Sequence, residues 1–423
     1  MVNGGGGNDV LRLFGTSGND KAVIYPGAAL LEHDAGHVGF DFSAVSVETI
    51  HYEGNGGAAD LAFLFDSAGD DLFLAGPGGG SMAGAGYANS VADVDSINGI
   101  ASGGTNDQAY LVDSAFDDDF SASPTVAGIG RRGLGPFATA SGFDLVVATA
   151  SAGGFDRAFL SDSAGDDLFD ARPGVANFSR MGAFVNRALG FEAVSASSLQ
   201  GGTDSAVLID SPGDDTLVSR GLQSFLQGGG FISIVDSFES LSVVASQGGF
   251  DRAFLEDTAG ADLFTGAPGQ STLQALGLQP AGTALTRTMV GFDVVSVQAL
   301  HGGADVADLF GTSGNDTFIA TPTGAAFAAG VGPAAALYVQ TFGFETVNAR
   351  AQAGADNRAL LTGGPGADLF FARGPSGTLS RAGFSTFVTG FQSVHLAGGG
   401  GLNTLNAAAL AFALTHDGTW TPA

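Results

Sequence analysis

Residues 191–218 read FEAVSASSLQGGTDSAVLIDSPGDDTLV, and this stretch recurs in varied form along the whole chain. It predicts a short apolar strand introduced by Phe191 and Glu192, a Gly-Gly turn, a second strand from Asp204, and an acidic turn that closes at Asp215. The acid that closes the second turn recurs about every 50 residues, at Asp20, Asp71, Asp118, Asp167, Asp215, Asp262, Asp316 and Asp368. Such a period is typical of a solenoid, whose units stack because no single unit buries its own hydrophobic face.

Alternation and turn chemistry indicate strands within each unit. The segments DSAVLID (204–210) and DRAFLED (251–257) repeat alanine and leucine on one face, at Ala206 and Leu208 and at Ala253 and Leu255. We expect this constant face to be the interior one. Turns such as DSAGDD (66–71) and GTSGND (311–316) follow, because Asp, Asn, Ser and Gly bond to their own backbone or accept positive φ.

The predicted fold class is all-β. With roughly four short strands in a unit, we expect a parallel β-solenoid of about eight repeats of about 50 residues each, with two coils per repeat. One coil per repeat, or a string of separate small β domains, are the alternatives, and the short connections argue against separate domains. Residues 1–423 are predicted to form a single repeat array, with 1–20 as an incomplete first repeat and 403–423 as a C-terminal cap.

The composition of the chain limits the classes of partner that it can bind. The chain of 423 residues has a formal charge of −28 and a single lysine, so nucleic acid is excluded as a partner and divalent cations are the expected counterions. It has no cysteine, which excludes disulfides and thiolate metal sites. Its apolar runs are too short and too often interrupted by Gly and Asp to predict a membrane span.

Two turns resemble a known calcium-binding repeat. GGGGNDVLR (4–12) matches the nonapeptide G-G-x-G-x-D-x-U-x, and GTSGNDTF (311–318) is similar to it with the first glycines lost. The chain thus resembles the hemolysin-type, or RTX, β-roll proteins, which are secreted and bind Ca²⁺ in the turns between coils. The resemblance implies calcium ligands at Asp9, Asp20, Asp71, Asp167, Asp215 and Asp316, and Asp118 occupies the same turn position.

The pattern also departs from that family. β-Rolls repeat the nonapeptide in tandem, whereas here the motif lapses after Asp20 for most of a unit. The alternative is that these Asp and Asn side chains make only Asx-turns. A second recurrent acid follows the opening aromatic of each unit, at Glu48, Asp95, Asp144, Glu192, Glu239, Asp293 and Glu345. We expect this acid to accept backbone N–H groups at the bend or to bond to the next coil.

The outward face of the first strand suggests a ligand surface. Phe63, Tyr110, Phe159 and Phe254 occupy the same place in their units and are predicted to form an aromatic stripe for a polysaccharide or a partner protein. In the alternative, the variable segments fold over these rings and bury them.

The sequence contains no catalytic motif such as G-x-S-x-G, H-E-x-x-H or a P-loop. We therefore expect a non-catalytic extracellular or cell-surface repeat protein that acts as a rigid spacer, scaffold or adhesin, with calcium as its stabilising ion. An uncapped solenoid end also predicts end-to-end association with further copies of the repeat. The alternative is a carbohydrate-active or carbohydrate-binding β-helix, because function depends on a site and not on the fold.

Overall fold

A computed structural model describes residues 1–33, 42–276, 284–332 and 335–423. These residues form strands and turns with no helix, and the coils stack in parallel as a β-solenoid of about 10 turns, which confirms the predicted fold class. Among them, no helix is long and apolar enough to cross a bilayer. The chain divides into two compact units: unit 1 contains Met1–Ser205 and Gly230–Ser237, and unit 2 contains Ala206–Gly229 and Phe238–Ala423.

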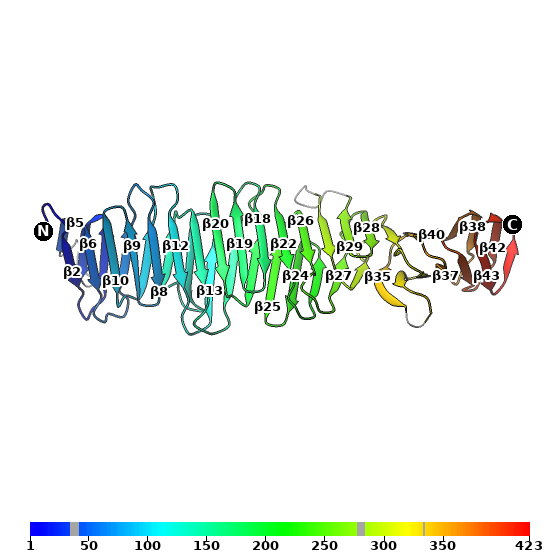
Figure 1. Cartoon of the computed structure of the whole chain (residues 1–423), viewed down its shortest axis with the longest axis horizontal. Helices are drawn as coiled ribbons and strands as arrows, with labels where there is room; N and C mark the ends of the chain where they lie inside the picture. Colours follow the sequence, from blue (N-terminus) through cyan, green and yellow to red (C-terminus); the bar gives the residue numbers. More distant parts are fainter. Residues whose placement is uncertain (34–41, 277–283, 333–334) are drawn as a thin grey trace. The chain divides into compact units, whose positions relative to one another are not determined.

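Two sheets, A and B, build unit 1, and Figure 1 shows their strands side by side. Sheet A contains, in spatial order, β1 (Val2–Asn3), β5 (Phe42–Val47), β4 (Gly27–His33), β3 (Asp20–Tyr25), β7 (Leu61–Phe65), β11 (Ser96–Ile100), β15 (Ala138–Ser141), β14 (Val126–Arg131), β13 (Asp118–Ala122), β17 (Arg157–Ser161), β21 (Ala193–Ser197) and β25 (Phe231–Asp236). Sheet B contains β2 (Val10–Phe14), β6 (Thr49–Glu53), β10 (Tyr87–Ala92), β9 (Gly79–Gly84), β8 (Leu72–Gly76), β12 (Gln108–Val112), β16 (Leu145–Thr149), β20 (Phe184–Leu189), β19 (Val175–Arg180) and β18 (Leu168–Arg172).

Unit 2 has the same arrangement. Its sheet A contains β24 (Gln223–Gly228), β23 (Thr216–Arg220), β27 (Arg252–Glu256), β31 (Val294–Gln298), β35 (Ala336–Phe342), β34 (Gly324–Ala329), β33 (Asp316–Thr321), β37 (Arg358–Thr362), β41 (Ser393–Ala397) and β43 (Ala413–Asp417). Its sheet B contains β26 (Ser240–Val244), β30 (Thr286–Val290), β29 (Gln270–Ala275), β28 (Asp262–Ala267), β32 (Val306–Phe310), β36 (Thr346–Arg350), β40 (Phe384–Thr389), β39 (Ser376–Arg381), β38 (Leu369–Gly374), β42 (Asn403–Leu410) and β44 (Trp420–Pro422). Strand β22 (Ser205–Ile209) begins at the last residue of the first segment of unit 1.

Within the described residues, each of the eight repeats from β1 to β40 has five strands where the sequence pattern suggested about four. In the repeat from β11 to β15, β11 lies in sheet A and β12 in sheet B, and β13, β14 and β15 form an antiparallel meander in sheet A. Strand β15 returns beside β11, and β13 pairs in parallel with β17 of the next repeat. The chain crosses between the sheets three times in a repeat, from β11 to β12, from β12 to β13 and from β15 to β16, so the next repeat begins in the other sheet, and its meander, β18 to β20, lies in sheet B.

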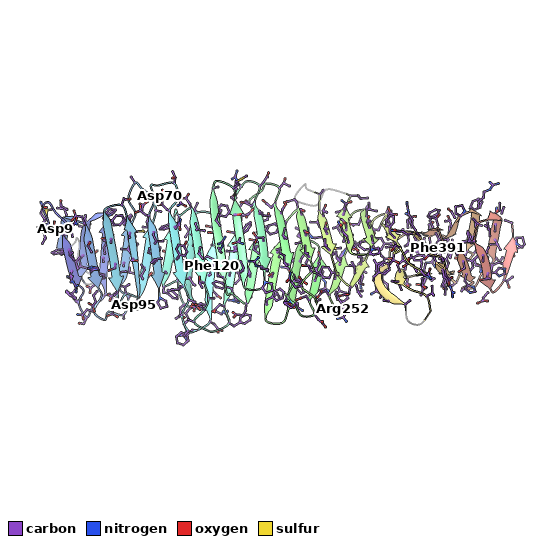
Figure 2. The ribbon with its side chains drawn as sticks, in the orientation of Figure 1. Asp9, Asp70, Asp95, Phe120, Arg252 and Phe391 are labelled. Atoms are coloured by element: carbon purple, nitrogen blue, oxygen red, sulfur yellow. The ribbon has the colours of Figure 1, made fainter. Side chains whose placement is uncertain are left out.

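The predicted interior face is confirmed. The alanines Ala62, Ala109, Ala158, Ala206 and Ala253 are all at most 1% exposed. Larger side chains fill the space between the sheets as phenylalanine pairs, such as Phe120 with Phe191 at 5.9 Å and Phe73 with Phe143 at 5.7 Å between ring centroids. Figure 2 shows Phe120 among the strands of unit 1. Each opening aromatic therefore closes the core beneath the bend it introduces.

Candidate functional site

Loops from successive repeats stack on one another at the edges of the two sheets. Each repeat has a glycine-rich loop after its first strand (loop 1), the acidic turn (loop 2), and a bend that leads into the next repeat. In one stack, loop 2 at residues 66–71 lies beside loop 1 at 101–107 and the bend at 142–144. Figure 2 shows Asp70 of loop 2 and Asp95 of a bend at opposite edges of the strands.

One hydrogen-bond relay connects the three loops of a stack. The bend carboxylate of Asp144 accepts the backbone N–H of Asp107 at 2.8 Å. The Asp107 carboxylate accepts the backbone N–H of Asp71, also at 2.8 Å. Asp71 in turn accepts the backbone N–H and the hydroxyl of Ser67, at 2.9 and 2.8 Å. Buried N–H groups that would otherwise lack a partner are thereby satisfied by side-chain oxygens.

The relay repeats along both units. Loop-1 side chains accept the N–H of the turn-closing residue in the pairs Asp20–Asp60, Asp118–Asp156, Asp167–Asp204, Asp215–Asp251, Asp262–Asp305, Asp316–Asn357 and Asp368–Asn403. Bend side chains accept the N–H of loop 1 in the pairs Asp9–Glu48, Asp60–Asp95, Asp156–Glu192, Asp251–Asp293, Asp305–Glu345 and Asn357–Gln392. The structural role predicted for the bend acids is confirmed.

A third acid joins the stack in the central repeats. The first aspartate of loop 2 accepts backbone N–H groups of loop 1 in the following repeat, at Asp66, Asp113, Asp162, Asp210 and Asp257. In three stacks the oxygens of all three acids lie within 4.8 Å of one another, in the sets Asp66–Asp71–Asp107, Asp210–Asp215–Asp251 and Asp257–Asp262–Asp305. All nine residues are buried. These sets, called the triple-aspartate clusters, concentrate charge where water does not screen it.

The electrostatics of the clusters follow from burial. Desolvation, and then repulsion from the neighbouring carboxylates, raises the pKa of Asp107 and of Asp305 to about 6. The pKa values of Asp215, Asp251 and Asp262 are also raised, first by burial. Closely spaced buried carboxylates need a shared proton or a cation to neutralise them.

One cluster has a cationic neighbour of its own. His301 Nδ1 lies 2.8 Å from Asp257 Oδ1. This hydrogen bond is the main reason that the pKa of His301 is raised. The imidazolium form therefore partly compensates the charge of this cluster.

The sequence-predicted metal residues all lie in these loops, but only some lie in clusters. Asp71 and Asp215 belong to triple-aspartate clusters, whereas Asp9, Asp20, Asp118, Asp167 and Asp316 do not. The sequence analysis did not identify Asp107 and Asp251, the cluster partners of Asp71 and Asp215, although the acid that ends loop 1 recurs visibly in the sequence. Buried carboxylate oxygens without a hydrogen-bond partner occur within the described residues at Asp9, Asp118, Asp162, Asp167, Asp316 and Asp368.

The two stretches with the nonapeptide resemblance occupy different loops. Residues 4–9 precede β2 as a loop 1, whereas 311–316 precede β33 as a loop 2. The motif therefore does not stack on itself in tandem.

The four aromatic residues do not form one row. Phe63 on β7, Phe159 on β17 and Phe254 on β27 lie in sheet A, whereas Tyr110 on β12 lies in sheet B. The odd number of crossings between sheets in each repeat moves the equivalent position from one sheet to the other. Tyr110, Phe159 and Phe254 are between 37% and 42% exposed, and Phe63 is half-buried, so the meanders do not bury these rings.

No family model, curated protein or solved structure matches the chain. Parallel stacked coils, five-strand repeats and a recurring loop relay identify the chain as a β-solenoid repeat protein.

Proposed function

We propose that the chain is a non-catalytic extracellular or cell-surface scaffold whose stacked coils are stabilised by divalent cations. The observation that carries the proposal is the loop relay. In each stack, the recurrent acids accept backbone N–H groups and so connect the loops of successive repeats. A catalytic site needs a distinctive constellation in one place. Two histidines are instead engaged in local contacts, His51 with Ser90, and His395 with Thr415 and Asp417.

The cation part of the proposal follows from a comparison between repeats. Asn357 and Gln392 make the same relay contacts as Asp107 and Asp144, at 2.8 and 2.7 Å, without any charge. The hydrogen bonds thus require an oxygen but not a carboxylate. The negative charge of the triple-aspartate clusters is additional, and a bound cation gives it a stabilising role.

Calcium is the ion we propose for these clusters. Its preferred ligands are carboxylate and carbonyl oxygens, and each cluster offers three carboxylates, with backbone carbonyls or water left to complete the six to eight ligands typical of Ca²⁺. The resemblance of residues 4–12 to the RTX nonapeptide supports the same ion and a secreted protein. Bound Ca²⁺ would neutralise the repulsion between loops of different repeats and hold their stack together.

Thermal melting in calcium, in magnesium and in chelator tests this proposal. A site that binds only the folded state adds about 2.7 kcal/mol when the ion is at a hundred times its dissociation constant, so calcium should raise Tm. Asp251→Asn should reduce the shift. The control Asp308→Asn alters a carboxylate outside the clusters, on the outer face of β32, and should leave the shift unchanged. Identical melting curves in calcium and in chelator would leave the aspartates with their Asx-turn role alone.

A further inference from the structure

The outer face of sheet A in unit 1 has a cavity of about 600 Å³. It lies over β13, β14, β15 and β17, beside the connection formed by residues 132–137. Its volume falls within the range of about 300 to 1,000 Å³ that is typical of small-molecule pockets. The cavity belongs to no loop stack, and no recurrent acid of the relay lines it.

Two glycines form the floor of the cavity. Gly128 and Gly130 on β14 lie opposite Ser121 and Asp119 of β13, so the middle strand has no side chain at these outward positions. A Cβ on Gly130 would lie 2.5 Å from the Cα of Pro136. The connection therefore folds closely over β14 and forms one wall of the cavity.

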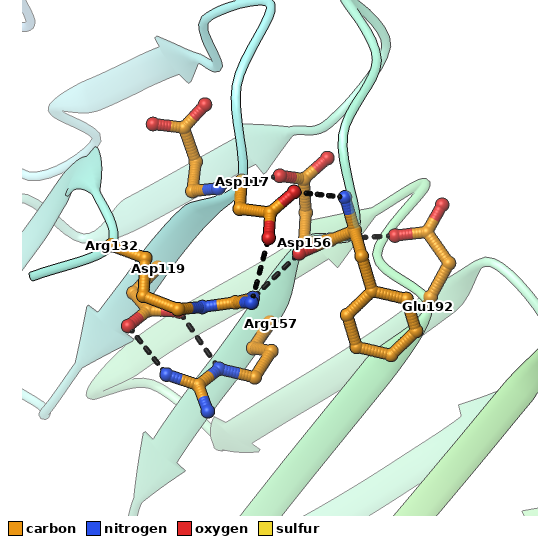
Figure 3. A network of polar contacts seen from close by, with 8 residues as sticks. Asp117, Asp119, Arg132, Asp156, Arg157 and Glu192 are labelled. Carbon is orange, nitrogen blue, oxygen red and sulfur yellow. Dashed lines mark hydrogen bonds and ion pairs between the residues drawn. The ribbon is translucent and has the colours of Figure 1, made fainter.

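A charged network fixes that wall. Arg132, at the start of the connection, donates to Asp117 at 3.0 Å and to Asp119 at 3.2 Å. Arg157 donates two hydrogen bonds to Asp119, at 2.9 and 2.7 Å (Figure 3). The two guanidinium groups lower the pKa of Asp119, and the hydrogen bond from Arg157 has the largest effect. This carboxylate therefore stays ionised and remains paired with both arginines. The cavity is thus formed before any ligand arrives.

The two charged residues of the lining, Asp119 and Arg131, are both engaged within the protein, and the other lining side chains are uncharged. The third arginine, Arg131, stacks on the ring of Phe116 at 3.9 Å. The hydroxyls of Ser121 and Ser197 make no hydrogen bond within the described part of the chain and line the cavity. Phe159 and Leu134 add apolar surface and are 39% and 69% exposed.

From this lining we infer that the cavity binds an uncharged saccharide. A sugar ring has hydroxyls that donate to and accept from serine, and a C–H face that packs on an aromatic ring such as Phe159. An anionic ligand would meet the carboxylate of Asp119, with Arg132 and Arg157 already paired with carboxylates and Arg131 stacked on Phe116. A purely apolar ligand would leave the hydroxyls of Ser121 and Ser197 without partners. The site gives the scaffold an adhesive function and does not depend on the proposed cations.

Saturation-transfer NMR on the full chain tests the inference. The probes are the methyl glycosides of glucose, galactose, mannose and N-acetylglucosamine, each measured in calcium and in chelator. We expect at least one glycoside to bind. Phe159→Ala should weaken that binding about tenfold through loss of the aromatic contact, and Ser121→Leu, which places a larger side chain beside Gly128 in the cavity, should abolish it.

The matched control is Phe254→Ala. Phe254 has the same place in its repeat and is 42% exposed, but it lies on β27 beside β23 and β24, and the connection after β24 has only residues 229 and 230 in place of 132–137. This variant should bind as the wild type does, and circular dichroism establishes that each variant is folded. The inference is wrong if no glycoside binds, or if Phe159→Ala and Phe254→Ala have equal effects. Binding that persists in chelator, without any calcium shift in Tm, would contradict the cation proposal and leave the saccharide site standing.

Discussion

Replacing Asp107 by asparagine separates the charge of a triple-aspartate cluster from its hydrogen bonds. The Asp107 carboxylate accepts the N–H of Asp71, and an asparagine oxygen can accept the same bond, as Asn357 does from Asp316. The amide of Asn357 donates to the carbonyl of Gln352, five residues earlier in its loop. An asparagine at position 107 keeps an acceptor oxygen for the N–H of Asp71, so the substitution removes mainly charge.

The size of the effect follows from the spacing and burial of the cluster. Two like charges 4.8 Å apart repel by about 3.5 kcal/mol at an effective dielectric constant of about 20. A rise in the pKa of Asp107 from 3.8 to about 6 corresponds to about 3 kcal/mol. Both routes give a destabilisation of up to about 3 kcal/mol when Asp107 is ionised without a counterion.

The difference in stability between Asp107→Asn and the wild type depends on pH. Since the pKa of Asp107 is higher in the folded state, the folded state binds this proton more tightly than the unfolded chain does. The resulting stability is fully present below the unfolded value of 3.8 and is lost as the pH rises through about 6. In chelator, Asp107→Asn should therefore be more stable than the wild type by up to about 3 kcal/mol at about pH 7.5, and nearly equal to it at about pH 4.

Urea unfolding followed by circular dichroism at both pH values provides the measurement. At the higher pH, saturating calcium should make the wild type more stable than Asp107→Asn, because the variant loses a cation ligand. The reverse substitution, Asn357→Asp, adds a charge beside Asp316 and should destabilise the chain at the higher pH in chelator. If Asp107→Asn were destabilising by the same amount at both pH values, the carboxylate would act only as a hydrogen-bond acceptor and our electrostatic reasoning would be refuted.

Two further predictions concern packing and local stability. Ala253→Leu should cost about 1 to 3 kcal/mol, because Ala253 is fully buried between the sheets and a larger side chain overpacks the core. Arg252→Leu, on the outer face of the same strand, should change Tm little, and equal losses would mean that the two faces are misassigned. Amides of residues 1–13 should exchange with solvent far faster than those of β17, because β2 pairs with β6 at the edge of sheet B whereas β17 pairs on both sides. Equal protection in a dilute monomer would contradict this.

The sequence alone determined the class of fold and the local chemistry of each unit. The recurrence of alanine and leucine in DSAVLID and DRAFLED identified the interior face, because a strand alternates its side chains with a period of two. The acids after each opening aromatic identified the bends, because buried backbone donors need acceptors. Both signals depend only on neighbours along the chain.

Tertiary structure alone decided which loops meet. Asp66, Asp71 and Asp107 come from two repeats, and their proximity depends on how many strands lie between them and on strand register. The three crossings between sheets in each repeat send Tyr110 and Phe159 to different sheets. The saccharide cavity likewise exists only because residues 132–137 fold back over Gly130. Contacts of this kind join residues that are distant in the chain, and no local pattern records them.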